Sequence, residues 1–202
     1  EVPATAALIN DTMTFIGSAN YYGALARDSE GKIYVNGGCH GSTSLFPIKR
    51  ANSFIPSFQE TFGGGTCDSF LARFSADLTT LEASTYIGGV NYENDFTNTI
   101  AIHGTGANTQ VFIVGDTARS LPIGAMKDAL NNNPNTLDLN PDPDEKIFTF
   151  GPLSSDSGDD VYIARFNRDL PAAAATIIGG SDHDPCPFIS LSDEGDVYFT
   201  AS

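Results

Sequence analysis

The chain has 202 residues, 41% of them hydrophobic, so it can bury a core and form one domain or part of a larger one. It carries 25 Asp and Glu against 10 Lys and Arg, and this net charge of −15 argues against nucleic acid and anionic membranes, which both require clustered cations. No apolar run approaches the ~18 residues of a spanning helix, and 20 Gly, 11 Pro and 14 Phe without Trp indicate a soluble, acidic, all-β protein.

Short patterns recur along the chain in a fixed order, which is typical of a repeat protein. A weak copy of the last pattern, Thr-Phe-Ile-Gly, comes first and predicts a lone strand at 13–17. A short alternating strand is predicted at 24–28, 99–103 and 188–191, each followed by a strand with an aromatic residue at 31–35, 110–114 and 195–199. Asp and Gly between them predict tight turns, as in Ser29-Glu30-Gly31.

Two further patterns complete the repeat. Residues 68–78 and 160–170 share Asp, Ala-Arg-Phe and Asp-Leu in register, and 84–89 and 175–180 share a strand that ends in Gly-Gly. Each unit therefore reads as four antiparallel strands, which is the blade of a β-propeller. Arg73 and Arg165 occupy matching positions, and we expect an architectural role in which they pair with the recurring Asp77 and Asp169 or with an adjacent blade.

Several of these segments resemble a known repeat. Ser-Thr-Tyr-Ile-Gly-Gly at 84–89, the segment at 63–74 that ends in Phe-Leu-Ala-Arg-Phe, and Ser-Leu-Phe-Pro at 44–47 are similar to the bacterial SBBP-type β-propeller repeat. The resemblance covers most of 13–202 and implies a propeller architecture in a secreted or surface-exposed bacterial protein. It says little about ligands.

The predicted organisation is an all-β partial propeller over 1–202. It comprises the lone strand at 13–17, one blade at 23–89, a second at 97–180 with a long acidic insert at 117–159, and the start of a third at 188–202. These about two and a half blades are fewer than the four that a closed ring needs. We expect the remaining blades to come from the same longer chain or from other copies.

The three cysteines, Cys39, Cys67 and Cys186, form no Cys-x-x-Cys pair. In an extracellular setting Cys39 and Cys67 would form a disulfide, and the alternative is three buried, reduced thiols. Cys186 has no evident partner in the sequence.

The acidic insert contains alternating oxygen-bearing residues, Asp138, Asn140, Asp142 and Asp144, which is the spacing a loop uses to bind Ca²⁺. Pro143 stands where an EF-hand loop needs glycine. The alternating prolines favour the other interpretation, an extended and solvated loop.

No catalytic motif is present. The histidines His40, His103 and His183 lack metal-ligand spacing, and no Gly-x-Ser-x-Gly sequence occurs. Asp28 and His103 follow equivalent strands, but the third copy has Ser192.

The sequence therefore predicts a non-enzymatic extracellular propeller without a required cofactor, acting as a structural, adhesion or assembly module. Its expected partners are other protein chains or surface glycans, with neither nucleic acid nor membrane insertion. The alternatives are a glycan-processing hydrolase or lyase on the same scaffold and a calcium-dependent binding module.

Overall fold

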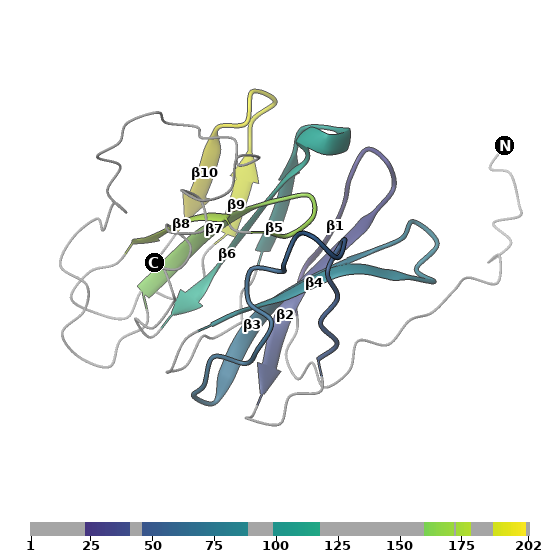
Figure 1. Ribbon diagram of the computed structural model, residues 1–202. Coiled ribbons are helices and arrows are strands. Elements are labelled where there is room, and N and C mark those ends of the chain that lie inside the picture. Colours follow the sequence, from purple (N-terminus) through teal and green to yellow (C-terminus); the bar gives the residue numbers. More distant parts are fainter. Residues whose placement is uncertain are drawn as a thin grey trace, which may run out of the picture.

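The computed structural model describes residues 23–40, 46–88, 99–117, 160–171, 173–178 and 188–200 (Figure 1). These residues form three antiparallel sheets and one short 3-10 helix, η1 (Gly106–Asn108), which confirms the all-β prediction. The sheets do not close into a ring. In this part of the chain no helix has the length and apolarity to cross a membrane.

The strands follow the repeated patterns in chain order. The first sheet contains β1 (Leu25–Arg27), β2 (Ile33–His40), β3 (Cys67–Phe74) and β4 (Leu81–Ile87), in that order across the sheet. The second contains β5 (Thr99–His103), β6 (Gln110–Thr117), β7 (Asp160–Asn167) and β8 (Ala173–Ile178), and the third contains β9 (Phe188–Leu191) and β10 (Val197–Thr200). The expected strand at 13–17 and residues 118–159 of the insert lie outside the described residues.

The first and third sheets begin with the same tight turn. Gly31 N–H donates to the carbonyl of Asp28 at 3.0 Å, and Gly195 N–H donates to the carbonyl of Ser192 at 3.1 Å. The two glycines have φ of 85° and 93°, a left-handed conformation that side chains disfavour. This geometry explains why glycine recurs there and confirms both predicted turns.

The turns that follow β3 and β7 explain the recurring Asp-Leu. Leu78 and Leu170 have φ of 59° and 56°, which is uncommon for leucine. Each donates its N–H three residues back, Leu78 to Ser75 and Leu170 to Asn167. The left-handed residue reverses the chain into the fourth strand of each sheet.

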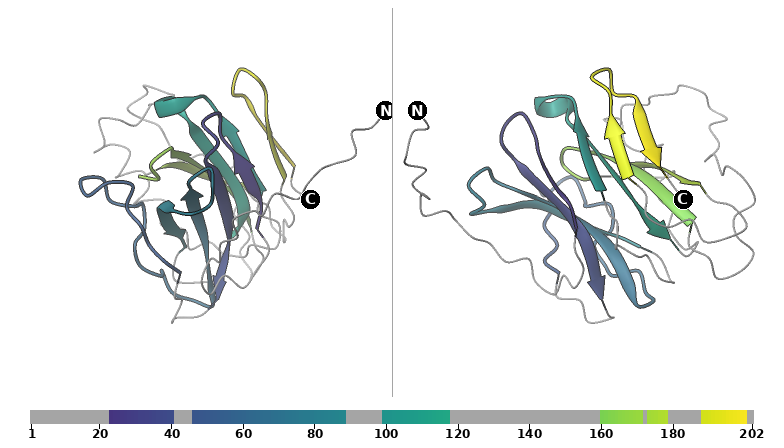
Figure 2. Two further views of the ribbon diagram at one scale, coloured as in Figure 1. Left: turned by 90° about the vertical axis from the view of Figure 1, so that its right-hand side faces the viewer. Right: turned by 180° about the vertical axis from the view of Figure 1, so that it is seen from behind.

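The sheets pack face to face, and their first strands lie next to one another. β1 contacts β5, and β5 contacts β9, which Figures 1 and 2 show as neighbouring strands. One core joins the first two sheets, with Tyr34 and Leu71 from the first packed with Ile113 and Phe166 from the second. A second core lies on the other face of the first sheet, where Phe46 packs on Phe70 and Tyr86.

Residues 46–62 run along the outer strand of the first sheet. Lys49 N–H donates to Ser84 Oγ at 2.7 Å, and Tyr86 N–H in β4 donates to the Gln59 carbonyl at 2.9 Å. Phe58 from this segment packs on Phe166 in the second sheet, with ring centroids 5.9 Å apart. The segment thus covers β4, a strand whose edge would otherwise be open to pairing.

The expected disulfide between Cys39 and Cys67 is not found. Cys39 lies opposite Asp68 and Cys67 lies opposite His40, so the two cysteines are offset by one residue in register. Because successive side chains point to opposite faces, the two thiols lie on opposite sides of the sheet. Both are buried, no disulfide occurs in the described ranges, and Cys186 lies outside them.

Candidate functional site

A pocket of about 480 Å³ lies where the first sheet meets the turns of the second. Arg73 belongs to β3 of the first sheet and Ile55 to the segment at 46–62, and the other lining residues belong to two turns of the second sheet and the strand ends beside them. These other residues are Ala107, Asn108, Thr109, Gln110, Asn167, Arg168, Asp169 and Pro171. The volume is within the range of small-molecule sites.

Arg73 forms the buried wall of this pocket. Its side chain is 7% exposed, and its Nε donates to Glu82 Oε2 at 3.1 Å within the first sheet. Its Nη1 donates across to the second sheet, to the Arg168 carbonyl at 2.6 Å and to Asp169 Oδ1 at 2.9 Å. Burial acts against the charged form, but the hydrogen bond to Asp169 keeps the pKa of Arg73 above its ordinary value.

This arrangement confirms the predicted pairing of Arg73 with Asp169. Asp77, the other predicted partner, instead binds its own turn, where its Oδ1 accepts from Ser75 Oγ at 2.6 Å and from Thr79 Oγ1 at 2.8 Å. These bonds lower the pKa of Asp77 to about 2. Arg73 therefore pairs with the Asp of the following unit rather than with that of its own unit.

The other cations around the pocket also contact carboxylates. Arg168 Nη2 lies 2.6 Å from Glu30 Oε2, which links the second sheet to the β1–β2 turn. Lys32 pairs with Glu82, the carboxylate that also binds Arg73. The positive charges of this region are thus balanced by acidic neighbours.

Asp28, which follows β1, stabilises the turn between β1 and β2. Its Oδ1 accepts from the N–H groups of Glu30 at 3.0 Å and Lys32 at 2.8 Å, and Tyr34 O–H donates to its Oδ2 at 3.4 Å. Burial of the phenol raises the pKa of Tyr34 to about 12, and the Asp28 carboxylate adds to the shift while Arg73 opposes it. These bonds hold Asp28 in a structural role.

Thr109 brings an unsatisfied polar atom to the pocket. The residue is 1% exposed, and its Oγ1 has no hydrogen-bond partner among the residues that the structure describes. It is extended and comes just before β6, so strand alternation places its side chain on the same face as Val111, toward the first sheet. A buried hydroxyl of this kind favours a partner from outside the chain.

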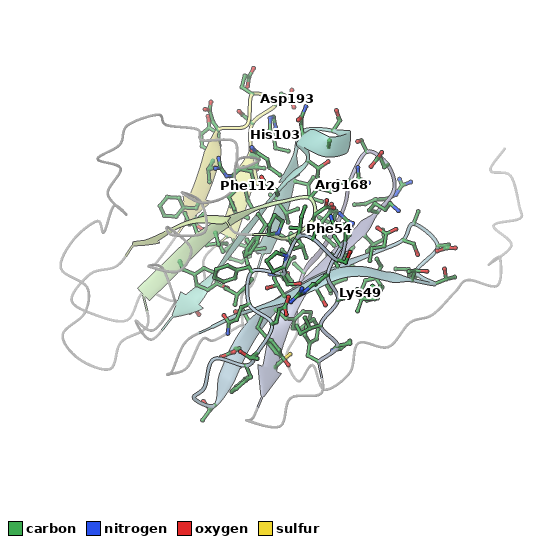
Figure 3. All side chains as sticks on the ribbon, in the orientation of Figure 1. Lys49, Phe54, His103, Phe112, Arg168 and Asp193 are labelled. Atoms are coloured by element: carbon green, nitrogen blue, oxygen red, sulfur yellow. The ribbon has the colours of Figure 1, made fainter. Side chains whose placement is uncertain are left out.

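Phe54 directly precedes the pocket residue Ile55 in the chain and is 93% exposed, a high value for a phenylalanine. Asn52 Oδ1 accepts from the N–H groups of Phe54 and Ile55, both at 2.9 Å, and so fixes a turn. Ile55, the next residue, lines the pocket together with Arg168. Figure 3 labels the side chains of Phe54 and Arg168.

The other predicted site residues are not brought to this pocket. Asp138, Asn140, Asp142, Asp144 and His183 lie outside the described residues, so the calcium site stays a prediction that melting with and without a chelator would test. Within the described ranges, no group of three or more His, Cys, Asp or Glu has the arrangement to hold a metal ion.

His103 has a packing role between the second and third sheets. A Cβ added at Gly195 would lie 2.9 Å from His103 Nε2, so glycine is needed there for close approach as well as for its φ. For His40 the structure describes only the place in β2.

The sequence analysis missed Phe54 and Thr109. Both lie in connecting segments whose sequences do not repeat, so comparing the repeated units with one another could not identify them. The sequence indicated an exposed aromatic side chain only through an isolated phenylalanine that follows Asn and Ser in a predicted loop.

No protein-family model matches this chain, and no curated protein matches it either.

Proposed function

We propose that this chain is part of a secreted, non-enzymatic β-propeller that acts as an adhesion and assembly module, completed by further sheets of the same kind. The face-to-face packing of successive sheets and the adjacency of β1, β5 and β9 support this proposal. The Arg73–Asp169 ion pair between units supports it as well, because it links one repeat to the next.

One observation carries the proposal. Tyr34, Phe112 and Tyr198 occupy the same register position in the three sheets, opposite equivalent residues of the first strands. Tyr34 is 0% and Phe112 is 5% exposed, whereas Tyr198 is 61% exposed. Each of the first two lies on the face turned to the next sheet, and Tyr198 is the position that a further sheet would cover.

The third sheet has the pattern of a unit that continues. Phe188 is 59% exposed and lies on the same face of the third sheet as Tyr198, so these two side chains form an apolar patch. Val197 and Phe199, which are 38% and 39% exposed, lie on the opposite face. In the other sheets the second strand pairs with a third strand that contains Ala-Arg-Phe. We therefore infer that a strand of this chemistry pairs with the edge of β10 that has no partner strand in the described part of the chain.

The two complete sheets define the register of that strand. Tyr34 lies opposite Arg73, and Phe112 lies opposite Arg165. The incoming strand would accordingly place its Arg opposite Tyr198, with Phe opposite Val197 and Ala opposite Phe199. The partner is an extended segment of this one pattern rather than any apolar protein surface.

A synthetic peptide that copies residues 160–167, Asp-Val-Tyr-Ile-Ala-Arg-Phe-Asn, tests the proposal. We expect it to slow amide hydrogen exchange in 197–200. A peptide with Pro in place of Ala should have no effect, because this Ala lies opposite Phe199 in a hydrogen-bonded pair and Pro cannot donate to the ladder. The Tyr198→Glu variant should lose the protection, and Phe54→Glu, at another exposed aromatic position outside the patch, should keep it. Equal exchange in 197–200 with and without the peptide would overturn the proposal.

A further inference from the structure

We propose that the pocket between the first and second sheets binds a neutral carbohydrate of one or two sugar units, with Phe54 at its mouth. The inference deepens the proposed function, since it names the ligand class of an adhesion module, and it rests on that proposal for its biological setting. The geometry of the pocket supports it independently.

The size and lining of the pocket suit a polyhydroxylated ligand. Its volume of about 480 Å³ accommodates a mono- or disaccharide, and two turns of the second sheet surround it with polar groups. Asn108 and Asn167 line it, and a carboxamide has a donor and an acceptor in one plane, which matches adjacent sugar hydroxyls. Asp169 adds an acceptor that remains 39% exposed beyond its bond to Arg73.

The Thr109 hydroxyl is the observation that points most directly to a ligand. A buried polar group normally has a hydrogen-bond partner, and Thr109 Oγ1 has none within the described part of the chain. Thr109 lines the pocket, on the face of the strand turned toward the first sheet. A sugar hydroxyl in the pocket would satisfy this group as donor or acceptor.

The charge of the region favours a neutral ligand over an anionic one. Arg73 is bound by Glu82 and Asp169, and Arg168 is paired with Glu30, so the pocket has no cation in excess of its carboxylates. The chain as a whole carries a net charge of −15. A phosphate, sulfate or uronic acid would therefore meet repulsion rather than a binding site.

Phe54 provides the apolar surface that the C–H face of a pyranose ring packs against. Its ring is 93% exposed, and the turn made by Asn52 holds its backbone in place. Ile55 and Pro171 continue the apolar surface into the pocket. Polar groups on one side and a flat aromatic ring on the other are the two features that an amphipathic sugar ring requires.

The test is titration of the isotope-labelled protein with cellobiose, maltose, lactose and mannobiose, followed by amide chemical shifts, with glucuronic acid as the anionic comparison. We expect at least one disaccharide to shift amides of residues 107–110 and 167–171 with a Kd of about 0.1–1 mM, and glucuronic acid to bind at least ~10-fold more weakly. No shift of these amides at ~20 mM of any disaccharide, or stronger binding of glucuronic acid, would overturn the inference.

Two variants separate ligand binding from folding. Thr109→Val keeps the shape of the side chain and removes the unpaired hydroxyl, so it should weaken sugar binding about 5-fold while it leaves the melting temperature equal or higher. Phe54→Ala should weaken binding about 10-fold without loss of stability, because the exposed ring has little packing to lose. Unchanged affinity in both variants would contradict the site.

Tyr198→Glu is the control for the relation between the two proposals. It should leave sugar affinity unchanged, while it abolishes protection by the strand peptide. Sugar binding without peptide protection would overturn the assembly proposal alone, and peptide protection without sugar binding would overturn the carbohydrate site alone.

Discussion

The interface between the first and second sheets and the outer face of the third sheet are built from the same sequence pattern, yet only the former is buried. At the interface Tyr34 is 0% exposed and Arg73 binds across to Asp169, whereas Tyr198 in the third sheet is 61% exposed. The strands and turns of the third sheet nevertheless match those of the first. The comparison teaches that the repeat specifies each sheet locally, while burial comes from the neighbouring unit, as in other repeat architectures.

The equivalent tyrosines give the largest expected difference. Tyr34→Ala should lower the free energy of unfolding by about 4 kcal/mol, because it leaves a cavity between the first two sheets. Tyr198→Ala should change it by less than ~0.5 kcal/mol, since that ring is already in solvent. Urea denaturation measures both, and equal effects would break the comparison.

The interface ion pair comes next in size. Arg73→Ala should lower the free energy of unfolding by about 3 kcal/mol, because Glu82 and Asp169 would lose their shared cation at a largely buried site. The matched control is Arg50→Ala, which breaks a pair with Glu60 in which the Arg50 side chain is 47% exposed. That variant should cost less than ~1 kcal/mol in the same urea titration.

The two leucines with positive φ separate backbone strain from burial. Glycine relieves the left-handed strain at either position, but Leu170 is fully buried between the sheets and Leu78 only partly buried within its own. Leu170→Gly should therefore destabilise the protein by about 2 kcal/mol, and Leu78→Gly by less than ~1 kcal/mol. If thermal melting showed Leu78→Gly to be the more damaging variant, the strain argument would be wrong.

The smallest effect is a pH dependence from Asp77, which binds within its own turn rather than across an interface. Its pKa in the folded state is about 2, below the ordinary value of 3.8, so its contribution to stability is complete above pH ~4 and is lost as the pH falls toward 2. Asp77→Asn should flatten the melting temperature over this range relative to the parent chain. If the melting temperatures of the two proteins fell identically between pH ~4 and 2, the Asp77 carboxylate would contribute nothing to stability.

The parts of the fold that repeat were predictable from the sequence. The alternating patterns located the strands, and Gly31 and Gly195 marked turns that need a positive φ. An architectural role for Arg73, paired with a recurring Asp or with an adjacent blade, was also predicted, and the structure has its ion pair with Asp169.

The parts that depend on register or on single connections were not predictable. Cys39 and Cys67 looked like a pair, but an offset of one residue between neighbouring strands places them on opposite faces, and sequence alone does not set that offset. Nothing in the sequence indicated the left-handed conformation of Leu170, since leucine rarely adopts it. Thr109 lines a pocket with Ile55 and Arg73 only because two turns of the next sheet approach the first.

The segment at 46–62 has a consequence for how such a molecule would grow. It occupies the side of β4, so a further strand cannot add laterally to the first sheet there. The edge of β10 has no such cover in the described part of the chain. In the proposed assembly, a further strand would therefore add at β10 and not at β4, which would give that assembly a polarity.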